Sequence, residues 1–214
     1  MVEHILYINL EHRIDRKDQI IKTLSQHFPE ETFYRIPGIL NIDSPCIGIA
    51  QAHINALEDA IKNNYRHVLI MEDDMLFNEF EKNYSKLKEL MALPYDVIVL
   101  GGVYVDYNPE TSKLHKCSSM GAYLVHQNYY HVLLNNFKDG LKNLIVEDLK
   151  LNSRTFSWNL NRGSLETARK YIIDKYWQIL QQKDNWFIIP LCYSKEDYSD
   201  SLKRVENWEP YFLK

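Results

Sequence analysis

The stretch VLIMEDD at residues 68–74 decides the fold. Four consecutive apolar residues predict a strand that is covered on both of its faces. Acids then follow at the C-terminal end of that strand, which is where open α/β sheets bind their ligands. Carboxylates there can hold a hard divalent cation, and that cation can hold a diphosphate. Because side chains alternate along a strand, we expect Glu72 and Asp74 on one side. The alternative is an acidic turn that opens the next helix.

On both sides of this stretch, predicted strands and helices alternate along the chain. Such alternation predicts an α/β fold: a mostly parallel central sheet with helices on both faces, in a single domain over residues 1–214. A hairpin or loop is expected over 104–116, and the tail over 191–214 shows no period. The expected strands are 4–10, 32–36, 68–71, 96–100, 122–125 and 186–190, and the expected helices are 15–27, 49–61, 79–91, 128–137 and 165–182.

Composition narrows the class of protein. With 214 residues, 45% hydrophobic content and a net charge of −4, the chain is an ordinary globular protein that does not bind nucleic acid through bulk positive charge. Three widely spaced cysteines favour a reduced compartment over a disulfide framework. No signal peptide and no bilayer-spanning run are visible, so we expect a cytoplasmic protein with at most peripheral membrane association. The glycine-rich dinucleotide and P-loop motifs are missing from the sequence.

Aromatic residues are frequent, with 15 Tyr, 8 Phe and 4 Trp. They become denser toward the C-terminal half, as at Tyr176-Trp177 and Tyr211-Phe212. Exposed rings can stack on the C–H faces of sugars, but aromatic residues more often fill cores and interfaces. His53 likewise lies on the apolar face of a predicted helix, where a hydrogen-bonded core histidine is commoner than a ligand.

Several short motifs occur in an order and spacing that resemble glycosyltransferase family 25 over about residues 3–200. That family includes bacterial lipooligosaccharide galactosyltransferases, collagen-modifying transferases and relatives from large viruses. The resemblance implies a GT-A fold, a UDP-sugar donor, a divalent metal ion (Mn²⁺ or Mg²⁺) and inversion at the anomeric carbon. The motifs are YINL at 7–10 with Arg13 and Arg16, RIPG at 35–38, GIAQAH at 48–53, LIMEDD at 69–74, Leu100-Gly101, GAYLV at 121–125, Pro190 and YSD at 198–200.

The resemblance also implies roles for individual residues. Asn9, Arg13, Arg16, Glu72 and Asp73 match the nucleotide-binding positions. Arginine suits phosphate because its planar fork makes paired hydrogen bonds, although a solvated basic loop is the alternative. The metal ligands implied by the resemblance and by the chemistry of hard cations are Glu72, Asp74 and Asp200, with Asp197 as a substitute for the last. The chain departs from the family at Lys195, near a position that is often Gln, and over 140–165.

Inverting transfer requires a base that takes the proton of the acceptor hydroxyl. We expect Asp174 in this role because aromatic residues that could bracket a sugar surround it in the sequence; Glu147 and Asp148 are alternatives.

The predicted function is therefore a metal-dependent inverting transferase that moves a hexose, galactose or glucose, from a UDP-sugar to a hydroxyl of a glycan, glycolipid or protein. Residues 1–105 would hold the nucleotide-sugar and metal, and residues 106–214 the acceptor. One alternative is a catalytically degenerate relative that only binds sugars or nucleotides. Another is a sugar-phosphate nucleotidyltransferase, although the loop at 11–16 lacks the glycines that such enzymes usually carry.

Overall fold

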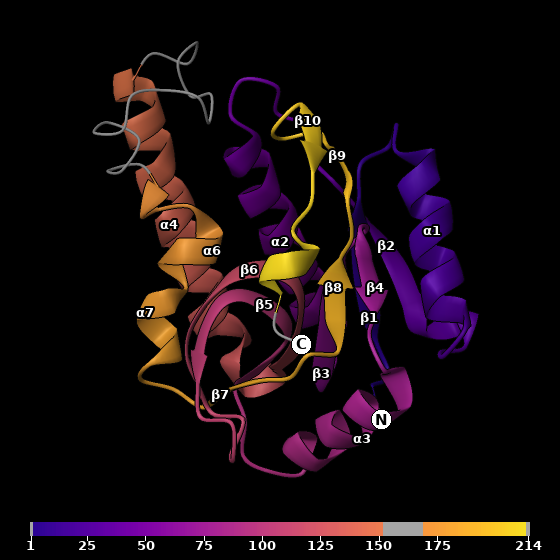
Figure 1. Ribbon diagram of the computed structural model, residues 1–214. Helices are drawn as coiled ribbons and strands as arrows, with labels where there is room; N and C mark the ends of the chain where they lie inside the picture. The colour runs from indigo at the N-terminus through magenta and orange to yellow at the C-terminus, as the bar shows by residue number, and fades with distance from the viewer. Residues whose placement is uncertain (1, 152–168, 213–214) are drawn as a thin grey trace.

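A six-stranded sheet forms the centre of the computed structural model, which describes residues 2–151 and 169–212, with the backbone alone at 148–151. The strand order is β2-β1-β3-β6-β5-β7 (Figure 1). β1 (Ile5–Asn9) is parallel to both of its neighbours, β2 (Phe33–Pro37) and β3 (His67–Glu72). The C-terminal ends of these three strands therefore meet at one edge of the sheet.

The other half of the sheet contains a long hairpin. β5 (Val97–Tyr107) and β6 (Leu114–His126) pair in antiparallel fashion, with register shifts between residues 99 and 107. β6 also pairs antiparallel with β3, whereas β7 (Trp186–Ile188) is parallel to β5. Among the six strands of the described sheet, only β6 runs against the others. The predicted mostly parallel sheet is confirmed.

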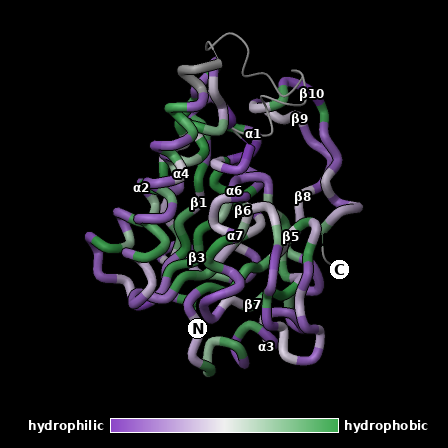
Figure 2. Tube along the Cα trace, turned by 90° about the vertical axis from the view of Figure 1, so that its left-hand side faces the viewer, coloured by the Kyte–Doolittle hydropathy of each residue, from purple (hydrophilic) through white to green (hydrophobic). Residues whose placement is uncertain are grey.

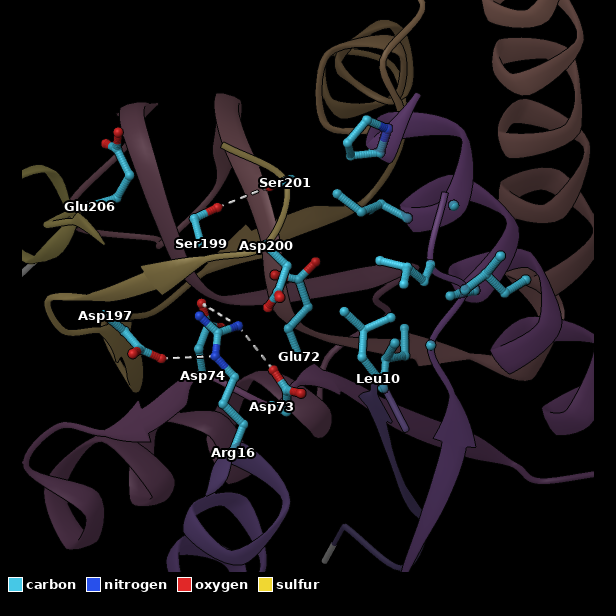
Figure 3. A pocket seen from close by; sticks show the side chains of 18 of the residues that line it. Leu10, Arg16, Glu72, Asp73, Asp74, Asp197, Ser199, Asp200, Ser201 and Glu206 are labelled. Carbon is cyan, nitrogen blue, oxygen red and sulfur yellow. Dashed lines mark hydrogen bonds and ion pairs between the residues drawn. The ribbon is translucent and has the colours of Figure 1, made fainter. Parts of the chain in front are cut away.

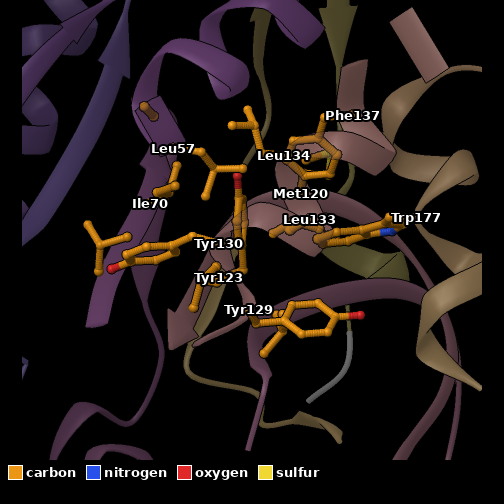
Figure 4. Packing of buried hydrophobic residues seen from close by; sticks show 14 of the residues in the cluster. Leu57, Ile70, Met120, Tyr123, Tyr129, Tyr130, Leu133, Leu134, Phe137 and Trp177 are labelled. Carbon is orange, nitrogen blue, oxygen red and sulfur yellow. The ribbon is translucent and has the colours of Figure 1, made fainter. Parts of the chain in front are cut away.

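Helices cover both faces of this sheet, as predicted. On one face of the sheet lie α1 (Ile14–Ser25) and α3 (Phe80–Met91). Their buried residues Ile20, Leu24 and Leu87 belong to the same hydrophobic cluster as Ile5, Leu69 and Ile98 of the strands. The opposite face carries α2 (Pro45–Lys62), α4 (Tyr130–Leu151) and α6 (Ile173–Tyr176). There Leu57, Leu133, Phe137 and Trp177 close around Tyr123 of β6 (Figure 4). Figure 2 shows the same division, with hydrophobic strands inside and hydrophilic segments outside.

The predicted helix over 165–182 differs most from the structure. Residues 165–168 lie outside the described part of the chain, and the remainder contains two short helices, α6 and α7 (Gln178–Gln181), each four residues long and separated from each other by Trp177. The backbone of Ile172 is extended, and its side chain is buried against Cys46 and Leu144. Tertiary burial of Ile172 thus overrides the helical spacing of the apolar residues. α4, in contrast, continues to residue 151, well beyond the predicted end at 137.

The tail that showed no period contains short strands. β8 (Cys192–Ser194) pairs with β4 (Met75–Phe77), and β9 (Asp197–Ser199) pairs with β10 (Arg204–Glu206) in a separate hairpin. A Cβ atom at Gly101 would lie 2.0 Å from the carbonyl oxygen of Cys192, so the returning tail requires glycine at this point of β5. The tail thereby crosses the edge of the sheet where β1 and β3 end (Figure 1).

The described helices include none with the length and apolar character needed to cross a membrane.

Candidate functional site

A cavity of about 200 Å³ lies at the C-terminal ends of β1, β2 and β3, beneath the β9–β10 hairpin (Figure 3). One wall is apolar and consists of Ile8, Leu10, the loop at 38–42 and the first turns of α2. A Cβ atom at Gly48 would lie 2.2 Å from the carbonyl oxygen of Ile39, so glycine lets this loop rest on α2. The opposite wall is charged. Six carboxylates and three basic side chains stand among the described lining residues: Glu72, Asp73, Asp74, Asp197, Asp200 and Glu206, with Arg16, Lys195 and Lys203.

The three acids after the VLIM strand do not divide as strand alternation predicted. β3 ends at Glu72, and Asp73 and Asp74 form a turn that leads into β4. Both aspartates therefore face Arg16, whose Nη1 lies 3.2 Å from Asp73 Oδ1 and 3.8 Å from Asp74 Oδ2. The carboxylate of Glu72 also lines the cavity, but its contact is with His53 and not with Arg16: its Oε1 lies 3.3 Å from Nε2 of His53. Alternation fails because it applies within a strand and the strand is already over.

Asp73 is held in place by Asn9. The Asn9 side chain donates from Nδ2 to Asp73 Oδ2 at 2.7 Å and to the carbonyl oxygen of Arg13 at 3.0 Å, and it accepts from Nε of Arg35 at 3.1 Å. Asn9 is almost completely buried, so in this structure it reaches the cavity only through Asp73. Burial raises the pKa of Asp73, and Arg16 and Asn9 offset that effect in part.

Asp74 has fewer partners. Ser194 donates to its Oδ2 at 3.3 Å, while its Oδ1 is buried and has no hydrogen-bond partner in the structure. Burial, together with the negative charge of Glu72, raises the pKa of Asp74 to about 7, although Arg16 opposes the shift. A buried carboxylate oxygen without a partner is costly, and a bound cation removes that cost. Of the predicted metal ligands, Asp74 fits the role best.

Asp200 and Asp197 contact arginines rather than Asp74. Asp200 accepts from Nη1 of Arg13 at 2.5 Å and lies 3.1 Å from Nε2 of His12. Asp197 accepts from Nε of Arg16 at 2.8 Å. Both arginines also donate to the carbonyl oxygen of Tyr198, so they fasten β9 to the N-terminal end of α1, where Arg13 precedes the helix and Arg16 lies in its first turn. Burial opposes ionisation of Asp200, but the hydrogen bonds from Arg13 and His12 outweigh it and leave its pKa lowered.

These contacts bear on the predicted metal site. In the described residues, no three or more His, Cys, Asp or Glu side chains converge in an arrangement that could hold a metal ion. Mg²⁺, however, is usually bound through one or two carboxylates, with substrate phosphates and water as its other ligands. The unpartnered oxygen of Asp74, with Glu72 beside it, fits such a partial site. The role of metal ligand predicted for Asp200 would require this carboxylate to break its ion pair with Arg13.

His53 contacts Glu72 from the protein interior. It is completely buried, with Nδ1 2.9 Å from the hydroxyl oxygen of Tyr123 and Nε2 against Glu72. The structure therefore shows a hydrogen-bonded core histidine, in agreement with its place on the apolar face of α2. Its imidazole joins the buried Tyr123 to a carboxylate at the cavity.

The predicted base, Asp174, lies outside the set of cavity-lining residues. It is half-buried at the start of α6, and burial raises its pKa, while Lys175 and the backbone N–H of Ser119 lower it. Glu72 raises it further, so the two carboxylates are within electrostatic reach of each other. Its role stays a prediction. Of the alternatives, the side chain of Asp148 lies outside the described residues.

Sequence reasoning missed the apolar wall at 38–42 and the contact from Ser194. The wall follows Pro37-Gly38 in a stretch that reads only as a loop, and Ser194 belongs to a three-residue strand. Gly48, Ile49 and Ala52 line the cavity and belong to the GIAQAH motif at 48–53. That motif was the signal that could have indicated a cavity beside α2.

Neither a protein-family model nor a curated protein matches the chain. Among solved structures, A197 from STIV is similar with a TM-score of 0.48 at 13% identity, over 95% of this chain and 93% of that one. A glycosyltransferase involved in the glycosylation of the major capsid of PBCV-1 gives a TM-score of 0.44 at 12% identity, over 87% and 81%. The mannose-1-phosphate geranyltransferase from Thermus thermophilus gives 0.47 at 11%, over 88% and 74%. Values this low transfer no activity or ligand, and the resemblance to glycosyltransferase family 25 stays a prediction.

Proposed function

We propose that the protein is a metal-dependent glycosyltransferase that uses a UDP-sugar as donor. The observation that carries the proposal is the buried, unpartnered Oδ1 of Asp74, at the end of a central strand and beside an arginine. An arginine next to an incompletely satisfied carboxylate is a suitable place for a diphosphate and the cation that accompanies it. The cavity joins this charged wall to an apolar wall against which a nucleoside can lie.

The donor would lie across both walls. The loop at 38–42 and Ile49 offer apolar contact to the uridine, and Asn41 offers an amide for its polar edge. Arg16 lines the cavity and would hold the diphosphate, while Arg13 stands behind it. Asn9 would act by keeping Asp73 in place beside Arg16.

The metal ion, Mn²⁺ or Mg²⁺, would be held by Asp74 and Glu72, with Asp200 as a further ligand if it leaves Arg13. Bound there, such an ion neutralises charge that develops on the leaving diphosphate. His53 would keep the Glu72 carboxylate turned toward the cavity, since its other nitrogen is fixed by Tyr123.

On the acceptor side, Asp174 would take the proton of the attacking hydroxyl, and attack from the face opposite the diphosphate would invert the anomeric carbon. Its raised pKa suits a group that must accept a proton near neutral pH. Most of the acceleration would come from alignment of the two substrates and from charge stabilisation by Arg16. The transferred sugar would be a hexose, galactose or glucose, and the acceptor a glycan, glycolipid or protein hydroxyl.

A donor screen tests the proposal. The protein is incubated with Mn²⁺ and a panel of nucleotide sugars, and released nucleotide is measured with and without a chelator. We expect release from a UDP-hexose that the chelator abolishes. Release from every nucleotide sugar alike, or release that the chelator leaves unchanged, would contradict the proposal. UDP binding without any turnover would favour the alternative of a degenerate relative that only binds. The ion pairs that Arg13 and Arg16 form with Asp200 and Asp197 of the tail are also compatible with that alternative.

A further inference from the structure

Exposure separates the aromatic residues of the C-terminal half into two groups. Trp177, Trp186 and Tyr129 belong to the core. In the described residues, five aromatic side chains are exposed by at least 36%, and three of them lie together: Tyr104 at 63%, Tyr211 at 52% and Trp208 at 36%. The rings of Tyr104 and Tyr211 are 5.9 Å apart between centroids, and those of Tyr211 and Trp208 are 6.0 Å apart. We call Tyr104, Tyr211 and Trp208 the aromatic row.

Two distant segments build this row. Tyr104 lies in the irregular part of β5 and has φ of 53°, a left-handed conformation that residues other than glycine rarely adopt. Trp208 directly precedes the short helix η4 (Glu209–Tyr211) and Tyr211 is its last residue; the bridge between Phe212 and Val103 attaches this helix to β5. Bulges and unusual backbone conformations concentrate near active sites, where they direct side chains.

The row connects the cavity to the predicted base. Trp208 at one end lines the cavity beneath the β9–β10 hairpin. At the other end, the Nζ atom of Lys175 lies 5.8 Å from the centre of the Tyr104 ring, and Lys175 follows Asp174 directly. Lys175 is exposed and also donates to the hydroxyl of Ser118. Flat apolar faces are therefore bordered by polar groups that can form hydrogen bonds.

We propose that the aromatic row binds sugar rings of the acceptor, which would make that acceptor a saccharide. The proposal rests on the proposed function, because the row is an acceptor subsite only if the cavity holds the donor. An aromatic face offers apolar contact to the C–H face of a sugar, while the hydroxyl groups at the sugar's edge remain free for the exposed Lys175 and for water. A protein partner fits less well, because three rings bordered by charges form a small patch that continues into the cavity.

Saturation-transfer NMR tests the row directly and needs no donor. The probes are methyl β-galactoside, methyl β-glucoside, methyl α-mannoside, lactose and cellobiose, titrated against the full chain. We expect saturation of the ring-face protons of at least one probe. Tyr104→Ala and Tyr211→Ala should each weaken its affinity roughly three- to tenfold, the range of one stacking contact. Tyr104→Phe keeps the ring and should bind like the wild type.

Tyr34→Ala is the matched control, since Tyr34 is exposed at 45% on the edge strand β2, away from the row. Binding should survive in this variant. Circular dichroism establishes that each variant is folded, and Tyr211→Ala answers the question if Tyr104→Ala does not fold. The proposal is overturned if no probe receives saturation from the wild type, if Tyr34→Ala and Tyr211→Ala weaken binding equally, or if gel filtration shows that Tyr211→Ala converts a dimer to a monomer.

UDP calorimetry on the same proteins separates this proposal from the proposed function. Tyr211→Ala should bind UDP like the wild type, because the ring lies outside the cavity. Saccharide binding that depends on the row in a protein that never binds UDP would leave a saccharide-binding surface and overturn the proposed function alone. UDP-sugar turnover whose acceptor KM is unchanged in Tyr211→Ala would overturn the row alone.

Discussion

Asp74 is the residue on which the proposed function of the cavity rests. One of its oxygens is buried without a partner, and the charge of Glu72 adds to the effect of burial, so its pKa is raised to about 7. Arg16 compensates only in part, because its Nη1 is closer to Asp73 than to Asp74. A carboxylate with an unpartnered buried oxygen destabilises the metal-free fold, whereas the same carboxylate favours the binding of a cation. Removing its charge should therefore stabilise the metal-free protein and weaken metal binding.

Asp74→Asn should abolish metal-dependent turnover and yet stabilise the metal-free protein at pH 8. Asparagine removes a charge that Arg16 compensates only in part, so Tm should rise, by about 2–4 °C for each kcal/mol regained. Thermal unfolding in a chelator and nucleotide release with Mn²⁺ measure the two effects. Asp139→Asn, at an exposed position on α4, is the control and should change neither. Near-normal turnover in Asp74→Asn would show that the metal site has been assigned wrongly.

The raised pKa of Asp74 also predicts a pH dependence. Because the folded-state pKa lies above the ordinary value of 3.8, its contribution to stability is fully present below about pH 4 and is lost as pH rises through about 7. A metal ion competes with the proton, so Mn²⁺ affinity should increase as pH rises from 6 to 8. Calorimetric titration of Mn²⁺ at several pH values measures this increase. The same titration of Asp74→Asn should lose it, and an equally steep increase in that variant would point to another group.

At the scale of elements, the β9–β10 hairpin determines what the arginines can bind. The hairpin stands apart from the main sheet and is fastened to the N-terminal end of α1 through Arg13 and Arg16. Asp197 and Asp200 therefore occupy the donors that a diphosphate would need. A ligand with phosphates must displace these carboxylates or bring a cation that attracts them.

Asp197→Asn should therefore bind UDP more tightly than the wild type when no metal is present. The loss of one partly exposed carboxylate that competes for Arg16 should raise affinity about two- to fivefold, as expected for a weak ion pair. Calorimetry in a chelator measures the change. Glu196→Gln removes the same charge one residue earlier, and among the described contacts Glu196 has no ion pair with either arginine, so its affinity should stay unchanged. Weaker binding in Asp197→Asn would mean that Asp197 positions Arg16 for the ligand.

The elements also show what the sequence could predict. β3 and α2 were located within a few residues, because VLIM and the apolar spacing of α2 are local signals. The acids at the end of β3 were placed at the correct edge of the sheet for the same reason. The hairpin was not predicted, since three-residue strands have no measurable period. The pairing of Arg13 with Asp200 joins the two ends of the chain and depends on the tertiary path of the tail, which local patterns do not encode.

In the whole molecule, the position of β6 brings the proposed donor cavity and the predicted acceptor side together. Although it comes from the second half of the chain, β6 lies between β3 and β5. β6 therefore lies next to the strand that ends in Glu72, and its Ser119 donates a backbone N–H to Asp174. The charge of Glu72 raises the pKa of Asp174 across this distance. The roles predicted for residues 1–105 and 106–214 would thus be carried out by one continuous sheet.

Asp174→Asn tests this arrangement. If Asp174 takes the acceptor proton, the variant should transfer sugar roughly a hundredfold more slowly, at the lower end of the range for a lost general base. Its affinity for UDP should match that of the wild type, because Asp174 is not among the residues that line the proposed donor cavity. Single-turnover transfer and calorimetry measure the two quantities. Glu147→Gln, the described alternative, should leave the rate unchanged. A hundredfold loss in that variant, with normal transfer by Asp174→Asn, would move the base to α4.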